Sequence, residues 1–404
     1  MRASSALALL FLLAAAACGD SNPSGPSAPV DPVLFRSYVA LGNSITAGFQ
    51  AGGINDSTQR ESYARLLAEQ MRTPYRYPSV GKAGCTPPLA NLLDVLSNPI
   101  ILLTCSAPSQ PAAGPLNNVA VPGANSFDLT DPGMSTTNRL ARYILGTGVT
   151  QVARAKEADP SFVTLWIGNN DILGEVTEGM LRAPDAAGTP PAQFAENYAR
   201  ITSALLGPNV RGGVLIGVVD ASLAPLLIPA SALADPAVRA GIERYAGRAV
   251  TVRADCAGSA SLISLGVAVA LRLDFSHTRE STIGCEKAAG QTGGVGDEFV
   301  LDADEMAAVR RTVAAYNAYI RAKADSLGFA YLDPNPLLQA LRADGRVPPT
   351  PDFDSTTRPF GLYVSADGVH PAGAAHRLLA NELIATIDAK YGVAIPPLAA
   401  TVAR

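Results

Sequence analysis

The chain has 404 residues, of which 48% are hydrophobic and 16% are charged, and its formal net charge at pH 7 is −4. This composition supports a large buried core and excludes an intrinsically disordered chain. The weakly acidic balance argues against a nucleic-acid-binding protein and against a polybasic membrane-surface protein, both of which would carry a basic face.

Residues 1–17 have the pattern of a secretory signal peptide, in which Arg2 precedes an apolar run that begins at Ala6. The run is too short for a stable membrane span, and no later apolar run reaches about 18 residues. It ends in three alanines before Cys18, which resembles a bacterial lipoprotein signal with Cys18 as the lipidated first residue. The alternative is ordinary cleavage after an Ala-x-Ala site, with Cys18 incidental.

Residues 18–33 are rich in Pro, Ser and Gly, and we predict that they form a tether because such a segment buries little apolar area. A tether behind a lipidated cysteine would hold the protein at a membrane while it reaches its substrate. We therefore expect an exported, membrane-anchored lipoprotein, located in the outer membrane or periplasm or at the cell surface.

Strand patterns alternate with helical patterns over residues 34–392, and residues 393–404 are expected to form a C-terminal tail. The candidate strands are Ser37–Leu41, Asn118–Val121, Phe162–Ile167, Gly213–Val219 and Phe329–Leu332. The candidate helices are Ser62–Met71, Ala192–Leu206, the segment between Asp302 and Gly328, and the segment from Pro371 to Gly392. This alternation predicts an α/β fold with a parallel sheet covered on both faces, in which ligands bind at the carboxyl ends of the strands.

Two irregular segments, at about residues 83–115 and 222–300, interrupt the alternation and are interpreted as insertions above the site. The first holds Cys85 and Cys105, and the second holds Cys256 and Cys285. Four cysteines allow three connectivities, and an exported compartment permits disulfides. We favour the local pairing within each insertion, which closes loops of about 20 and 30 residues and stabilises by roughly 3 kcal/mol each. Four buried free thiols are the alternative.

The insertions also bear on metal and substrate binding. The chain has no Cys-x-x-Cys spacing and only three histidines, so no zinc site is expected. The apolar stretch Leu262–Leu273 in the second insertion is expected to form a cap that lines an acyl-chain pocket.

Four short motifs each follow a candidate strand or open a helix. They contain Ser44, Gly123, Asn170 and the pair Asp367 and His370. Each has a local explanation, since Ser44 and Asp367 could cap helices, Asn170 could form a turn, and Gly123 alone carries little information. Taken together, all four fall at the same edge of one parallel sheet, so we expect these side chains to meet there.

In this order, Gly-Asn-Ser, Gly, Gly-x-Asn-Asp and Asp-x-x-His, the motifs resemble those of the SGNH hydrolases, also called the GDSL esterase/lipase family, over residues of about 36–392. The resemblance implies a three-layer αβα sandwich with a flavodoxin-like parallel sheet of about five strands. It also implies that Ser44 is the nucleophile, that His370 is the base, and that Asp367 orients the histidine.

The same resemblance implies an oxyanion hole made by the backbone N–H groups of Ser44 and Gly123 and by the side-chain amide of Asn170. No metal or organic cofactor is implied. The family usually has Asp before the serine, whereas this chain has Asn43. We expect this difference to change the hydrogen bonding of the loop.

The remaining candidates are expected to be structural. His376 lies in the last predicted helix at a position expected to face solvent, and His277 in the second insertion is expected to be structural or exposed. Asp171 is interpreted as a turn-stabilising carboxylate, and Trp166 as a core residue.

We therefore expect an exported serine hydrolase that cleaves carboxylic esters of lipids or small acyl groups through an acyl-enzyme. Its expected partners are a small-molecule or lipid ester and a membrane contacted through the lipid on Cys18, and no nucleic acid. The alternatives are a carbohydrate O-deacetylase or thioesterase of the same fold, and a non-catalytic surface lipoprotein that binds a ligand.

Overall fold

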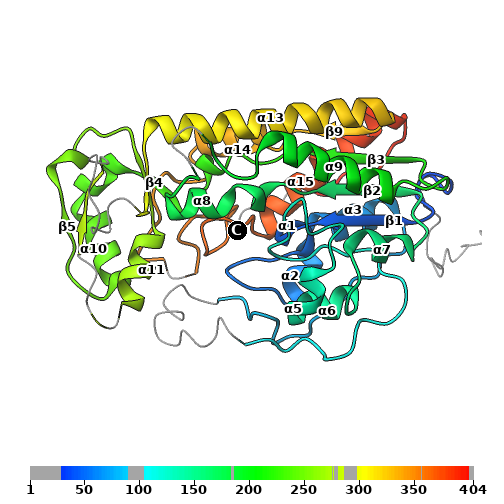
Figure 1. The fold of residues 1–404 in the computed structure, drawn as a ribbon, viewed down its shortest axis with the longest axis horizontal. Coiled ribbons are helices and arrows are strands. Elements are labelled where there is room, and N and C mark those ends of the chain that lie inside the picture. The colour runs from blue at the N-terminus through cyan, green and yellow to red at the C-terminus, as the bar shows by residue number, and fades with distance from the viewer. Residues whose placement is uncertain are drawn as a thin grey trace, which may run out of the picture.

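A computed structural model describes residues 29–89, 104–182, 186–274, 276, 281–285, 298–355 and 357–399, which form an elongated α/β molecule (Figure 1). The expected signal peptide, Cys18, most of the expected tether and His277 lie outside the described residues.

Four parallel strands form the main sheet in the order β1-β2-β3-β9. They are β1 (Tyr38–Gly42), β2 (Phe162–Trp166), β3 (Gly212–Ile216) and β9 (Ala330–Leu332). Every residue of β1, β2 and β3 is buried, which explains why these strands read as continuous apolar runs instead of alternating ones.

A fifth, shorter segment extends the sheet beside β1. Ala40 donates a backbone hydrogen bond to Asn117 at 2.7 Å, and Val119 and Val121 donate to Ala40 and Gly42 at 3.1 Å each. The predicted strand at Asn118–Val121 is therefore a brief edge pairing, which stops at Pro122 because proline has no N–H. With this segment, the chain order across the sheet is 2-1-3-4-5, which is the flavodoxin-like order.

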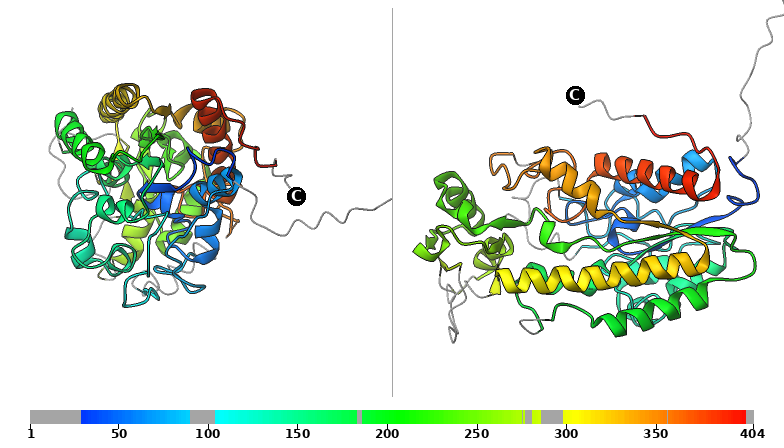
Figure 2. Two further views of the ribbon diagram at one scale, coloured as in Figure 1. Left: turned by 90° about the vertical axis from the view of Figure 1, so that its right-hand side faces the viewer. Right: turned by 90° about the horizontal axis from the view of Figure 1, so that it is seen from above.

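Helices cover both faces of the sheet, and the three layers are visible in Figure 2, right, with the strands between two groups of helices. One face carries α7 (Gln151–Lys156), α9 (Pro191–Leu205) and α13 (Ala303–Leu327), and the other carries α3 (Tyr63–Met71) and α15 (Gly373–Tyr391). Alternate strand residues supply the two cores, so that Val39 and Leu41 face one helical layer while Tyr38 and Ala40 face the other. The expected αβα sandwich is confirmed.

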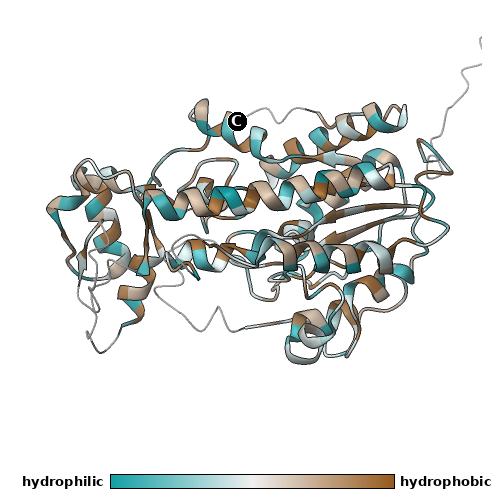
Figure 3. Ribbon diagram, turned by 45° about the horizontal axis from the view of Figure 1, so that its top comes forward, coloured by the Kyte–Doolittle hydropathy of each residue, from teal (hydrophilic) through white to brown (hydrophobic). Residues whose placement is uncertain are grey.

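Local signals in the sequence set the helix ends. Asp302 and Glu305 form a capping box at the start of α13, and Gly328 ends it in a left-handed conformation. The predicted start of the last helix at Pro371 was wrong, because Pro371 pairs with Val364 in a short β-bridge before α15 begins. Figure 3 shows hydrophobic residues concentrated on the strands, while the long helices alternate hydrophobic and hydrophilic residues, as expected for helices that cover a sheet.

Shorter helices connect these elements. They are α1 (Ser44–Ala47), α2 (Asp56–Glu61), α5 (Gly133–Thr137), α6 (Arg139–Leu145), α8 (Leu173–Glu178) and α14 (Asn335–Ala343). Within the described part of the chain, no helix combines the length and apolar character needed to cross a membrane.

The second irregular segment builds a small body with its own hydrophobic core at the left of Figure 1. It contains an antiparallel sheet of β4 (Leu227–Pro229), β6 (Leu262–Ser264) and β8 (Val300–Leu301), a parallel pair of β5 (Thr251–Val252) and β7 (Thr282–Ile283), and the helices α10 (Pro236–Ala246) and α11 (Gly266–Leu273). The predicted disulfides Cys85–Cys105 and Cys256–Cys285 are both present.

Candidate active site

Ser44 lies at the end of β1, where the chain turns sharply into α1. Gly42 makes this turn with φ +152°, and a Cβ atom there would lie 2.4 Å from the carbonyl oxygen of Trp166. Asn43 is the N-cap of α1, since its Oδ1 accepts the Ile45 N–H at 3.1 Å. The helix is therefore capped by Asn43, which leaves the Ser44 hydroxyl free for another partner.

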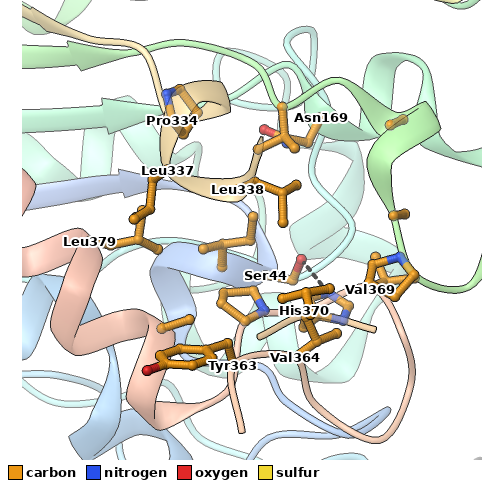
Figure 4. A pocket seen from close by; sticks show the side chains of 18 of the residues that line it. Ser44, Asn169, Pro334, Leu337, Leu338, Tyr363, Val364, Val369, His370 and Leu379 are labelled. Atoms are coloured by element: carbon orange, nitrogen blue, oxygen red, sulfur yellow. Dashed lines mark hydrogen bonds between the residues drawn. The ribbon is translucent and has the colours of Figure 1, made fainter. Parts of the chain in front are cut away.

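Ser44, His370 and Asp367 meet in a single hydrogen-bonded chain. The Oγ of Ser44 lies 2.9 Å from Nε2 of His370, although 326 positions separate the two residues (Figure 4). The other ring nitrogen, Nδ1, lies 2.9 Å from Oδ2 of Asp367. This arrangement allows the imidazole to accept the serine proton while the carboxylate fixes the ring orientation and stabilises the imidazolium.

The Asp367 carboxylate accepts several further hydrogen bonds. Its Oδ2 accepts the Gly52 N–H at 2.8 Å, and its Oδ1 accepts the Ser365 hydroxyl and the N–H groups of Val369 and His370, each at 2.9 Å. Burial raises the pKa of this carboxyl, but the adjacent His370 and these hydrogen bonds outweigh it and hold the pKa well below its usual value. Asp367 therefore stays ionised at neutral pH, as its place beside the histidine requires.

The Gly52 donor belongs to a loop that is held by the segment around Cys85. Backbone hydrogen bonds join Ile54 to Thr86 at 2.8 Å and Cys85 to Ile54 at 2.9 Å. A Cβ atom on Gly53 would lie 2.4 Å from the Pro87 carbonyl carbon, so the loop fits only with glycine there. The position of the Gly52 N–H therefore depends on the first irregular segment.

The second irregular segment contacts the loop that carries Asp367 and His370. The Leu226 N–H donates to the Gly368 carbonyl at 2.9 Å, and Leu265 in turn donates to Leu226 at 2.9 Å. Gly368 adopts φ +72°, and a Cβ atom there would lie 2.7 Å from the Phe360 ring. Sequence reasoning missed these contacts, because Gly52 and Leu226 come from distant parts of the chain, although Ser365 lies only two residues before Asp367.

The three expected oxyanion donors lie around the same strand ends. Asn170 lines the pocket that contains Ser44, and its Nδ2 donates one hydrogen bond to the Ala124 carbonyl at 2.9 Å. Gly123 follows the edge segment that pairs with β1 and has φ +84°. Across the described residues, the backbone N–H groups of Ser44 and Gly123 have no hydrogen-bond acceptor, although Gly123 does not line the pocket.

Asp171 fixes the loop that carries Gly123. Its Oδ2 accepts the Ser126 N–H at 2.8 Å and its Oδ1 accepts the Ser126 hydroxyl at 2.5 Å, while Asn197 donates to the same hydroxyl at 3.0 Å. Burial raises the pKa of Asp171, and its hydrogen bonds with Ser126 oppose part of the shift. The carboxylate was expected to stabilise its own turn, but its hydrogen bonds to Ser126 hold a second loop 45 positions away.

A cavity of about 120 Å³ opens beside Ser44 and His370. Its lining is almost entirely apolar, as Figure 4 shows, and includes Ile45, Val219, Pro225, Leu337, Leu338, Leu341, Val347, Val364 and Leu379. The expectation that Leu262–Leu273 lines the pocket was wrong, because no residue of that stretch lies in its wall. That stretch instead packs in the core of the second irregular segment, and α14 supplies the pocket wall.

His376 is fully buried, so its expected exposure to solvent was wrong. Its Nδ1 accepts the Tyr63 N–H at 3.2 Å, and the two rings stack with centroids 6.2 Å apart. Burial, with a smaller effect of His370, lowers the pKa of His376 to about 3. His376 is therefore a neutral core residue, and Trp166 is a buried core residue as expected.

Metal binding finds little support in the arrangement of side chains. Among the residues that the structure describes, one cluster has metal-ligand spacing, namely Asp255, Cys256 and Cys285. The two sulfur atoms are joined in a disulfide, so they do not provide thiolate ligands.

Comparisons with known proteins bear on this geometry. A family model described as GDSL-like Lipase/Acylhydrolase matches residues 38–383, a range that contains all four motifs. A search of curated proteins finds no match.

Among solved structures, a variant of the acetyl-xylooligosaccharide esterase Axe2 from Geobacillus Stearmophilus is 12% identical with a TM-score of 0.36, covering 87% of this chain and 93% of the other. A phospholipase A1 from Streptomyces albidoflavus NA297 is 15% identical with a TM-score of 0.32, covering 88% of this chain and 98% of the other.

Proposed function

Since the chain belongs to the GDSL-like lipase/acylhydrolase family, we propose that it hydrolyses carboxylic esters with Ser44 as nucleophile, His370 as base and Asp367 as orienting acid. The observation that carries the proposal is the hydrogen-bonded chain from Ser44 Oγ through the imidazole to the Asp367 carboxylate, with both distances at 2.9 Å. A serine hydroxyl is a weak nucleophile, and a base at this distance removes its proton as it attacks.

In the first step, Ser44 Oγ attacks the ester carbonyl carbon and its proton passes to Nε2 of His370. The C=O double bond opens, and negative charge collects on the former carbonyl oxygen. The N–H groups of Ser44 and Gly123 and the second N–H of Asn170 are proposed to bind this oxygen, and each such donor contributes about 10²–10³-fold to the rate.

In the second step, the tetrahedral intermediate collapses, the alcohol leaves with the proton from His370, and Ser44 carries the acyl group. Water then attacks the acyl carbon with His370 again as base, which releases the carboxylic acid and restores the hydroxyl. Ionised Asp367 stabilises the imidazolium in both steps, which is consistent with its lowered pKa.

The apolar cavity beside Ser44 supports a substrate with an aliphatic acyl chain, in preference to an acetylated polysaccharide. Aromatic residues make up 6% of the chain, and Tyr363 and Trp166 are the aromatic residues in the pocket wall. A sugar-binding cleft usually offers stacking rings and polar groups, whereas this wall offers aliphatic side chains.

Export and lipid anchoring at Cys18 are part of the same proposal. They rest on the N-terminal sequence, and the two disulfides support them because such bonds persist in oxidising compartments. Radiolabelled palmitate should label the protein expressed with its leader in a bacterium, and Cys18→Ser should remove the label. Equal labelling of the two forms would contradict anchoring at Cys18.

A fluorophosphonate probe, which reacts with activated serines, tests the proposed chemistry. We expect stoichiometric labelling at Ser44, and we expect Ser44→Ala to lose both the labelling and the hydrolysis of p-nitrophenyl butyrate by about 10⁴-fold or more. Ser326→Ala is a matched control, because Ser326 is exposed on α13 and bonds only to the Lys323 carbonyl. Unchanged hydrolysis by Ser44→Ala, or no labelling of the folded wild type, would overturn the proposal and favour a ligand-binding lipoprotein.

A further inference from the structure

The apolar cavity beside Ser44 has two helical walls that lie close to the reactive atoms. One face of α14 contributes Leu337, Leu338 and Leu341, which recur at intervals of three and four residues. The start of α15 contributes Ala375 and Leu379, four residues apart. In Figure 4 the side chains of Leu337, Leu338 and Leu379 project into the space beside Ser44. The cavity therefore begins at the nucleophile and is lined by residues of both helices.

The cavity wall offers few polar atoms to a ligand. The polar residues in its lining are Ser44, Asn169, Asn170, Tyr363 and His370. Asn169 Oδ1 and Trp166 Nε1 are shielded from solvent and have no partner among the described residues, so they do not face the cavity surface. The part of a substrate that enters this space is therefore a hydrocarbon group.

The reaction sequence assigns this space to the acyl group and not to the alcohol. The alcohol takes its proton from His370 and leaves before water attacks, so the side on which it lies must let water reach the acyl carbon. An apolar pocket excludes water, so the leaving alcohol does not lie in it. The acyl chain stays bound through both steps, and burial of its apolar surface lowers the free energy in each.

The volume of the cavity limits the length of the chain. An apolar cavity of about 150 Å³ accommodates benzene, which has six carbon atoms. A cavity of about 120 Å³ therefore accommodates about five carbons beyond the carbonyl. We propose that the pocket formed by α14 and α15 selects acyl chains of about four to six carbon atoms, an inference that rests on the proposed ester hydrolysis.

Chain-length profiles test this selection. With p-nitrophenyl esters from acetate to dodecanoate, we expect kcat/KM to rise by up to about fourfold per methylene as far as hexanoate. It should then fall at octanoate and beyond, because longer chains exceed the cavity. With butyrate esters of alcohols from methanol to octanol, kcat/KM should change little, since the alcohol lies outside the pocket.

Leu338→Ala removes three carbon atoms from the wall, which enlarges the cavity and should move the optimum to acyl chains about two to three carbons longer. Leu338 is only half-buried, so the change should leave the fold intact, which a thermal unfolding curve checks. Leu273→Ala is the matched control, since Leu273 on α11 is 44% exposed and does not line the cavity. Its profile should equal that of the wild type.

Three results would overturn the proposal: an optimum at acetate or at dodecanoate in the wild type, the same optimum in a folded Leu338→Ala variant, or a strong dependence on the alcohol instead of the acyl chain. Binding to the pocket can also be measured without catalysis. Butanoate and hexanoate should raise the melting temperature more than dodecanoate does. If no ester is hydrolysed but this order of stabilisation holds and shifts in Leu338→Ala, the proposed function fails while the acyl selectivity stands.

Discussion

The burial of His376 makes a specific prediction about acid stability. A neutral histidine in the core must take up a proton when the protein unfolds in acid, because the imidazole is then exposed to water. Its pKa is about 3 in the folded protein, against about 6.5 for a free histidine. The unfolded chain therefore binds more protons between these values, and stability falls as the pH drops from about 6.5 towards about 3.

The size of this effect depends on how far the pH lies below the pKa of a free histidine. At pH 4.5, two units below 6.5, one such histidine lowers the free energy of unfolding by about 3 kcal/mol relative to pH 8. Asp367 has a lowered pKa, so its contribution is lost only below about pH 4 and stays outside this window. Asp171 has a raised pKa, so ionising it costs stability as the pH rises, which is the opposite sign.

Urea unfolding at pH 8 and pH 4.5, followed by circular dichroism with the disulfides intact, measures the effect. His376→Asn retains an acceptor for the Tyr63 N–H and removes the titration, whereas the contributions of the aspartates are common to both proteins and cancel. We expect the wild type to lose about 3 kcal/mol more than the variant between the two pH values.

Leu379→Ala serves as a control, because it weakens the same helix and leaves His376 in place. Between pH 8 and pH 4.5, this variant should lose as much free energy of unfolding as the wild type. An equal loss in the wild type and His376→Asn, within about 0.5 kcal/mol, would refute the reasoning, since it would mean that His376 takes up its proton in the folded state.

Three further changes test how the site is held. Asp367→Asn should lower kcat by about 10³–10⁴-fold with a small change in KM, measured with p-nitrophenyl butyrate, because the ring loses its charged partner. Asp171→Asn should lower kcat by about ten- to a hundredfold at similar KM, since the clamp on Ser126 is weakened and an oxyanion donor moves; an effect on KM alone would argue against it. Gly53→Ala should reduce kcat and the melting temperature, whereas Gly207→Ala, whose Cβ meets no atom within 4 Å, should change neither.

The sheet and the reactive residues could be predicted from sequence because their signals are local. β1, β2 and β3 are runs of buried residues, and each of the four motifs stands next to a strand or helix end. The parallel order then places all strand ends at one edge of the sheet. The pairing of Cys85 with Cys105 and of Cys256 with Cys285 also followed from short separations in sequence.

Features that depend on packing between distant segments were missed or predicted wrongly. His376 was assigned to solvent because it lies outside the apolar positions predicted for the last helix, which are Ala375, Leu379, Leu383 and Ile387. The helix packs against both β9 and α3 and buries a second stripe, which runs through His376, Ala380 and Ile384. That stripe repeats every four residues in the sequence and could have indicated the burial.

The pocket wall shows the same limitation. The Leu262–Leu273 stretch has the higher apolar content and was expected to contact substrate, but most of its apolar side chains pack in the core of the second irregular segment. The helix α14 has a narrow apolar face. In the sequence, this face has the same pattern as an ordinary stripe that faces the core. Only the tertiary arrangement distinguishes a stripe that faces the core from one that faces a cavity.

The two irregular segments both hold the backbone around the Asp367 carboxylate. The first positions the Gly52 N–H, which donates to Asp367 Oδ2, and the second holds the Gly368 carbonyl through Leu226. A buried carboxylate stays ionised only where such donors are fixed, because burial alone would raise its pKa. Each segment also contains a disulfide, which limits how far its backbone moves. The crosslinks therefore lie in the two segments whose backbone contacts hold the loops around Asp367.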